Sequence, residues 1–123
     1  MPRIFLDLPR PTSTNRMHAP AGSGKRRSDE YEAWRTAAGW EIAAARPRMP
    51  VRALPAGCRW RSRIRISVDD RIDADNPVKP LHDLLVSLRI VPDDRNLWGG
   101  SYCRSASVPK GRIHVWIWSI GSQ

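Results

Sequence analysis

Long apolar runs are absent from this 123-residue sequence, and cysteine is nearly absent too. The apolar stretches are short and interrupted by Arg or Pro, whereas a membrane-spanning helix needs about 20 apolar residues in a row. No segment is therefore predicted to cross a membrane. The N-terminal residues carry Asp7 and Pro9 where a secretory signal would need an unbroken apolar stretch. We expect a cytoplasmic protein.

The two cysteines, Cys58 and Cys103, lie in no CxxC or Cys/His spacing of the kind that binds zinc. In a cytoplasmic protein we expect them to be free, buried thiols rather than a disulfide. The histidines are isolated, and GSGK at 22–25 lacks the Ser or Thr that completes a phosphate-binding loop. No organic cofactor is expected.

Negative charge is scarce over most of the chain. Lys and Arg total 21 against 12 Asp and Glu, which gives a net charge of +9. A domain this basic most often binds a polyanion such as nucleic acid. Seven of the twelve acids nevertheless fall between Asp69 and Asp94. Such a concentration of carboxylates in a basic protein suggests a divalent cation held against a bound phosphate.

The length and the apolar periodicity predict one α+β domain spanning residues 1–123. We expect a mixed β-sheet of about four strands packed against two main helices. The predicted elements are strands at 3–8, 59–68, 97–106 and 112–119, and helices at 29–45 and from Pro77 to about Arg89. Residues 9–27 are rich in Pro, Gly, Ser and basic side chains, so they are predicted to be a loop, with 16–27 a mobile basic segment.

The first predicted helix has the clearest local signals. Ser28 is a favourable N-cap, and acids follow it in the first turn. Tyr31, Trp34, Ala38 and Ile42 then recur at helical spacing, which predicts one buried side. We favour Tyr31 and Trp34 as core anchors, with base stacking as the alternative.

The strand at 59–68 alternates cleanly between apolar and basic residues. One side is predicted to be buried: Trp60, Ile64, Ile66 and Val68, with Ser62 among them. The other side carries Arg59, Arg61, Arg63 and Arg65. Four arginines without an interleaved acid repel one another, so a polyanion partner and a solvated outer face are equally plausible readings.

Two further elements carry specific expectations. The second helix should begin at Pro77, a residue favoured at the first helical position, with Asp75 or Asn76 as its cap. The strand at 112–119 has bulky groups on both sides. We therefore expect that strand to be covered on both sides or to lie at an interface.

The acidic stretch carries the chemistry. Asp73 and Asp75 are two residues apart in an extended segment, so their side chains should point the same way and favour a divalent cation between them. Asp93 or Asp94 follows the second helix and can complete the site. Lys79, in the first turn of that helix, can pair with a scissile phosphate or stabilise developing charge. A carboxylate pair alone is a weak signal, because such pairs also occur in solvated turns.

The stretch RIDADNPVKPLHDLL at 71–85, followed by IVPDD at 90–94, resembles the signature of the RusA family of Holliday-junction resolvases. The opening LPRPTSTN at 8–15 is similar to that family's proline-containing N-terminal segment, and the resemblance covers most of the chain. The matched positions are Asp73, Asp75, Asn76, Lys79, Asp83, Asp93 and Asp94.

The resemblance implies a homodimer that binds four-way or branched DNA and hydrolyses two strands symmetrically, in recombination and repair. It implies Mg²⁺, with Mn²⁺ as a substitute, bound by Asp73, Asp75 and Asp94, and an essential Lys79. Proteins of this kind are often encoded by phages, so the expected location is the cytoplasm of a bacterial or phage-infected cell. The residues expected to contact DNA are Asn15, Arg16, Lys25, Arg26, Arg27, Arg59, Arg61, Arg63, Arg65, Arg71 and Asn76.

Two other functions fit the same residues. One is a basic nucleic-acid-binding protein without catalysis, which would tolerate Asp75→Asn. The other is a less selective metal-dependent nuclease that cuts flaps or other branched DNA. The sequence does not separate this second alternative from a resolvase, because selectivity depends on dimer geometry rather than on the carboxylates.

Overall fold

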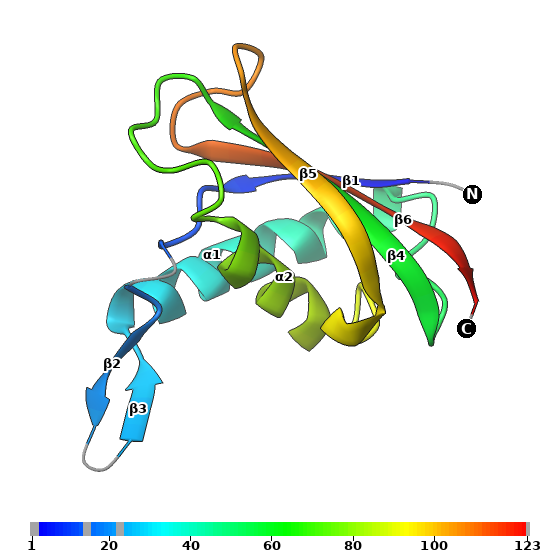
Figure 1. Ribbon diagram of the computed structural model, residues 1–123, viewed down its shortest axis with the longest axis horizontal. Helices are drawn as coiled ribbons and strands as arrows, with labels where there is room; N and C mark the ends of the chain where they lie inside the picture. The colour runs from blue at the N-terminus through cyan, green and yellow to red at the C-terminus, as the bar shows by residue number, and fades with distance from the viewer. Residues whose placement is uncertain (1–2, 14–15, 22–23, 123) are drawn as a thin grey trace.

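The computed structural model describes residues 3–13, 16–21 and 24–122 (Figure 1). Its elements, in chain order, are β1 (Ile4–Pro9), β2 (His18–Ala21), β3 (Gly24–Arg27), α1 (Asp29–Ala45), η2 (Arg46–Arg48), β4 (Cys58–Ser67), α2 (Val78–Ser87), η3 (Asp94–Asn96), β5 (Leu97–Ser105) and β6 (Arg112–Ser122). No helix within the described ranges is long and apolar enough to cross a membrane.

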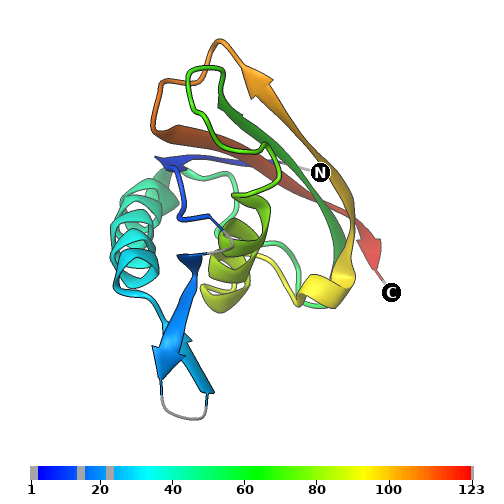
Figure 2. The ribbon, with the colours of Figure 1, turned by 60° about the vertical axis from the view of Figure 1, so that its left-hand side comes forward.

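The main sheet has four strands in the order β1-β6-β4-β5. β6 runs antiparallel to both β1 and β4, whereas β5 is parallel to β4, so the sheet is mixed. Both helices lie on the same side of this sheet (Figure 2). The predicted α+β class and its two-layer arrangement are confirmed. β5 and β6 follow one another in the chain but do not pair, because β4 lies between them.

The core lies between the helices and the sheet. Tyr31 and Trp34 of α1 are 2% and 7% exposed, which confirms that both are core anchors. The indole Nε1 of Trp34 also donates a hydrogen bond of 2.8 Å to the carbonyl oxygen of Pro9, and so ties α1 to the end of β1. From the sheet, Trp60, Ile64 and other alternate residues of β4 fill the same core, as the sequence predicted.

The segment at 16–27 contains more structure than expected. β2 and β3 pair as an antiparallel hairpin, with His18 opposite Arg27, that projects away from the main sheet (Figure 1). Its base is closed by the backbone N–H of Ser28, which donates to the carbonyl of Met17. The prediction of a plain loop was wrong because these strands pair through backbone groups and show no apolar alternation. The mobility of the segment stays a prediction.

Several smaller expectations need correction. β4 ends at Ser67, whose hydroxyl accepts from the Asp69 N–H, so Val68 leaves the predicted buried side and is 52% exposed. Cys103 was predicted to be buried, but it is exposed because it lies on the edge strand β5; Cys58 is buried as expected, and both are free.

The start of α2 also differs from the prediction. Pro77 occupies the N-cap position, and no side chain caps the helix. The carbonyl oxygen of Asp75 accepts from the N–H of Val78, which forms a turn in place of a side-chain cap. At the other end α2 stops at Ser87, two residues earlier than predicted, and Arg89 follows with a left-handed φ of 57°.

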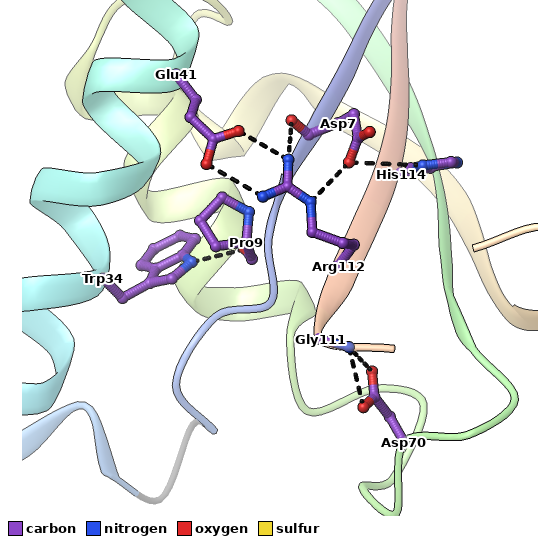
Figure 3. Close-up of polar contacts among 8 residues, drawn as sticks. All are labelled: Asp7, Pro9, Trp34, Glu41, Asp70, Gly111, Arg112 and His114. Carbon is purple, nitrogen blue, oxygen red and sulfur yellow. Dashed lines mark hydrogen bonds and ion pairs between the residues drawn. The ribbon is translucent and has the colours of Figure 1, made fainter. Parts of the chain in front are cut away.

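A guanidinium group joins both layers of the fold (Figure 3). Arg112, at the start of β6, forms a two-pronged ion pair with Glu41 of α1, with N–O distances of 2.7 and 3.1 Å. Its Nε also donates to Asp7 of β1 at 3.1 Å, and its Nη2 donates to the Asp7 carbonyl. The Glu41 contacts, above all, raise the pKa of Arg112. A two-pronged, charge-assisted ion pair of this kind fixes the relative orientation of the two side chains as well as the distance between them.

Two glycines should respond oppositely to alanine. A Cβ at Gly100 of β5 would lie 2.6 Å from the backbone oxygen of Ser62, so Gly100→Ala should lower the free energy of unfolding by about 1–3 kcal/mol. A Cβ at Gly39 of α1 would meet nothing within 4 Å, so Gly39→Ala should raise it by about 0.5–1 kcal/mol. Denaturant unfolding measures both changes in the free energy of unfolding. Equal effects of the two substitutions would contradict the close approach of β5 to β4 at Gly100.

His82 should make the stability depend on pH. It is buried between α2 and the sheet, 2.9 Å from the Ser62 hydroxyl, and burial lowers its pKa from 6.5 to about 4. The unfolded chain therefore binds more protons between pH 4 and 6.5, so the free energy of unfolding should fall by roughly 3 kcal/mol as pH decreases through that window.

The measurement is denaturant unfolding at pH 7, 5.5 and 4.5 for the wild type and for His82→Gln. The same carboxylates are present in both proteins, so the difference between the two pH profiles reports on the imidazole. Parallel profiles would show that His82 is accessible to protons in the folded state.

Candidate active site

The segment between β4 and α2, residues 69–76, carries Asp73 and Asp75. It is a series of turns, and it is held to the sheet at several points. Arg104 of β5 donates from Nη1 to the Asp70 carbonyl at 2.7 Å and from Nη2 to the Ile72 carbonyl. Because one guanidinium holds two carbonyls two residues apart, it restrains the backbone directly before Asp73.

Asp70 is the second anchor of this segment. The residue is only 4% exposed, and a buried carboxylate is costly unless it is paired. Its side chain accepts from the backbone N–H of Gly111 at 3.3 Å (Figure 3) and lies 3.1 Å from the guanidinium of Arg10. From the sequence alone, no separate role was predicted for Asp70. Its role depends on β1 and β6, which meet there through the Arg10 N–H and the Gly111 carbonyl.

A polar cleft of about 380 Å³ lies beside this segment. It brings Asp73 together with Asn76 and three arginines from separate parts of the chain: Arg10, Arg16 and Arg71. Arg16 also lies 3.9 Å from Glu30 of α1. Three of the residues predicted to contact DNA, Arg16, Arg71 and Asn76, therefore surround one predicted metal ligand. Arg10 is an addition, and nothing in its sequence context distinguished it.

Lys79 lies in the first turn of α2 and is exposed. Its Nζ is 3.5 Å from the carboxylate of Asp83, one helical turn further on. An exposed pair at this spacing contributes only about 0.3–0.5 kcal/mol, so Lys79 can exchange this partner for a phosphate at little cost. Asp75 is exposed in the turn just before this helix.

A second cleft, of about 300 Å³, contains carboxylates from α2 and from the segment that follows it. Asp83, Asp93 and Asp94 line it, facing Arg27 of the hairpin and Arg35 of α1. Consecutive residues line the two clefts at the start of the hairpin. Arg16 lines the first cleft, and Met17 lines the second.

Asp93 and Asp94 differ in electrostatic environment although they are adjacent. Asp93 accepts from the backbone N–H of Arg95, which is the main reason that its pKa falls to about 2. The pKa of Asp94 is raised, chiefly by its hydrogen bond to Asp93, then by desolvation and by the charges of Asp93 and Asp83. The charge of Asp94 is thus less compensated than that of Asp93, and a nearby cation would relieve this repulsion.

The geometry supports the predicted metal site only in part. Asp73 and Asp94 line separate clefts, and within the described ranges no three His, Cys, Asp or Glu side chains are grouped closely enough to hold a metal ion. The donor chemistry itself fits, since Asp73, Asp75 and Asp94 are exposed carboxylates of the type that Mg²⁺ prefers.

Among the remaining predicted DNA contacts, the arginines of β4 lie apart from these clefts, whereas Arg27 does not. Arg59, Arg61, Arg63 and Arg65 of β4 point to the side of the sheet opposite the helices, away from the carboxylates. Arg27 lines the second cleft and pairs with Glu32 at 3.3 Å. Asn15 lies outside the described residues, as do the side chains of Lys25 and Arg26.

No protein-family model matches the chain, and no curated protein matches it. The resemblance to the RusA family therefore stays a prediction. The function proposed below is inferred from the arrangement of the side chains in the two clefts.

Asp70 offers a test of how the site is positioned. Asp70→Ala should lower the free energy of unfolding by roughly 1–3 kcal/mol, because the Gly111 N–H and the Arg10 guanidinium lose a buried acceptor. Amide hydrogen exchange across residues 69–76 should accelerate at the same time. The matched control is Asp69→Ala, an exposed acid one residue away, which should change stability by less than about 0.5 kcal/mol. Equal exchange in both variants would show that Asp70 does not hold the segment.

Proposed function

We propose that the protein is a Mg²⁺-dependent DNA endonuclease that resolves Holliday junctions, with Asp73, Asp75, Asp94 and Lys79 as its catalytic residues. The observation that carries this proposal is the first cleft, where Asp73 and Asn76 lie among three arginines: one directly after β1, one at the hairpin base and one in the segment before α2. Acidic and basic groups mixed in this way suit a phosphate that is bound together with a cation.

Each residue has a separate part in this proposal. Asp73, Asp75 and Asp94 would hold the metal, which supplies polarisation of the phosphoryl oxygen and a water of lowered pKa. Arg10, Arg16 and Arg71 bind and orient the phosphates on either side of the scissile bond. Lys79, at the N-terminal end of α2, leaves Asp83 and stabilises the negative charge that develops on the phosphoryl group.

A four-way junction has equivalent strands, and a two-fold dimer offers two equivalent sites to them. We therefore propose a homodimer that makes paired, symmetric cuts, acting in recombination and repair in the cytoplasm of a bacterial or phage-infected cell. A less selective nuclease for flaps or branched DNA would use the same residues, and a non-catalytic DNA-binding protein would use only the arginines.

The test is cleavage of a labelled, immobile four-way junction with and without Mg²⁺, beside matched duplex and flap substrates. Paired junction cuts are expected only with the metal, and Mn²⁺ should substitute for it. Asp75→Asn should slow cleavage by about a hundredfold or more, because several kcal/mol of charge stabilisation depend on the bound metal. Junction binding should persist or tighten, since a repelling carboxylate is removed.

Asp69→Asn is the matched control, since it removes an exposed acid from the same segment and should cut at the wild-type rate. Binding without any cut would contradict the enzymatic proposal and leave the non-catalytic alternative. Equal cutting of junction, duplex and flap would retain the metal site and discard junction selectivity.

A further inference from the structure

One side of the main sheet faces away from both helices (Figure 2), and the strand register places arginine and aromatic residues on it. We call it the open face. The pairing register and the alternation of buried residues assign to it Phe5 and Asp7 of β1, Arg3 directly before that strand, His114, Trp116 and Trp118 of β6, the four odd-numbered arginines of β4, and Trp98 of β5. From the sequence, these arginines were predicted to contact phosphates or to form a solvated face, and the strand that carries Trp116 and Trp118 was predicted to be covered on both sides or to lie at an interface.

The register arranges these side chains in rows across the strands. Phe5 lies opposite Trp116, which in turn lies opposite Arg63. In the next row Trp118 lies opposite Arg61, with the guanidinium of Arg3 4.4 Å from the Trp118 ring. Each row therefore places flat aromatic rings beside positive charge, at the spacing of neighbouring strands, about 4.8 Å.

The rings are accessible and held in place. Phe5 and Trp98 are 44% and 53% exposed, which is high for large apolar side chains in a small domain. Phe5 packs against Trp116 with ring centroids 4.9 Å apart, and Arg59 lies 4.6 Å over the Trp98 ring. Rings braced by such contacts are already ordered, so a planar ligand that stacks on them loses little additional entropy.

The charge of the open face favours one kind of binding partner over another. Among the described residues assigned to this face, Asp7 is the one acid, and it is already paired with Arg112. The side chains of Arg61 and Arg63 have no hydrogen bond or ion pair to any described residue. A second copy docked by a two-fold axis would set arginines against arginines, which is repulsive. A polyanion is favoured instead, and the aromatic rings favour one whose bases are unstacked.

We propose that the open face is a second nucleic-acid site, which binds single-stranded nucleic acid by stacking unpaired bases on Phe5 and Trp98 and by pairing phosphates with Arg61 and Arg63. It goes beyond the proposed junction cleavage, because the site lies across the sheet from the clefts of Asp73 and Asp94 and needs no metal. A duplex would gain only the arginine contacts, since its bases already stack on one another.

The test is fluorescence anisotropy of labelled 15-mers in EDTA, comparing oligo(dT), oligo(rU) and a mixed-sequence duplex. Both single strands should bind more tightly than the duplex, and their ratio tells whether DNA or RNA is preferred. Phe5→Ala and Trp98→Ala should each weaken oligo(dT) binding about tenfold. Arg61→Ala/Arg63→Ala should reduce the slope of log affinity against log salt by about 1–2.

Matched controls exist elsewhere on the chain. Trp40 of α1 is 73% exposed but lies off the open face, and Arg48 and Arg52 are exposed near η2. Trp40→Ala and Arg48→Ala/Arg52→Ala should leave oligo(dT) affinity unchanged. Stacking should also quench tryptophan fluorescence, and this quenching should shrink in Trp98→Ala but not in Trp40→Ala.

Two outcomes would overturn the proposal. The first is equal affinity for duplex and single strand together with wild-type binding by Trp98→Ala. The second is a shift from dimer to monomer in sedimentation velocity when Phe5 and Trp98 are replaced, which would identify the open face as a subunit interface. Asp75→Asn should bind oligo(dT) normally, so failure of junction cleavage and failure of this site are distinguishable.

Discussion

The buried carboxylate of Asp70 is the constraint on which the candidate site depends. It lies where three strand ends meet: the end of β4, the end of β1 through Arg10, and the start of β6 through the Gly111 N–H. A carboxylate in so dry a position is tolerated only when it is paired, so the three ends must stay together for the charge to be satisfied. Asp73 follows three residues later, and its position is therefore set by the sheet rather than by a free loop.

The same junction explains why the first cleft exists. Arg10 pairs with Asp70 and also lines that cleft, so the bond that satisfies the buried charge places a guanidinium beside Asp73. Arg112, the residue directly after Gly111, ties β6 to Glu41 of α1 and so fixes the helix whose N-terminal turn carries Glu30. Structural ion pairs and candidate site residues thus belong to one continuous network around the ends of β1, β4 and β6.

Local signals in the sequence were enough to predict most of the fold. The helix at 29–45 followed from the Ser28 cap and the spacing of Tyr31 and Trp34, and β4 followed from strict alternation over ten residues. Both signals arise from neighbours along the chain and from one buried side, which a sequence displays directly. The bounds of the strands were accordingly correct to within a few residues, and the α+β class followed from their order.

What the sequence did not predict depends on contacts between distant residues. The β2–β3 hairpin has no apolar alternation, the strand order places β4 between β5 and β6, and Arg10 gains its role only through Asp70. The acidic motif predicted Asp73 as a site residue, but its spacing says nothing about which side chains share its cleft. The motif could therefore predict the type of ligand and not the geometry around it.

The chain separates its charges by the two sides of one sheet. The carboxylates of the candidate site lie on the helix side, where arginines from four different segments face them. The arginines of β4 lie on the open face, where acids are almost absent. A protein that bound its polyanion in one place only would have no need of the second set, and unpaired like charges on one strand destabilise the sheet. The cost of keeping four arginines there is the strongest physical reason to expect that both sides bind an anionic partner.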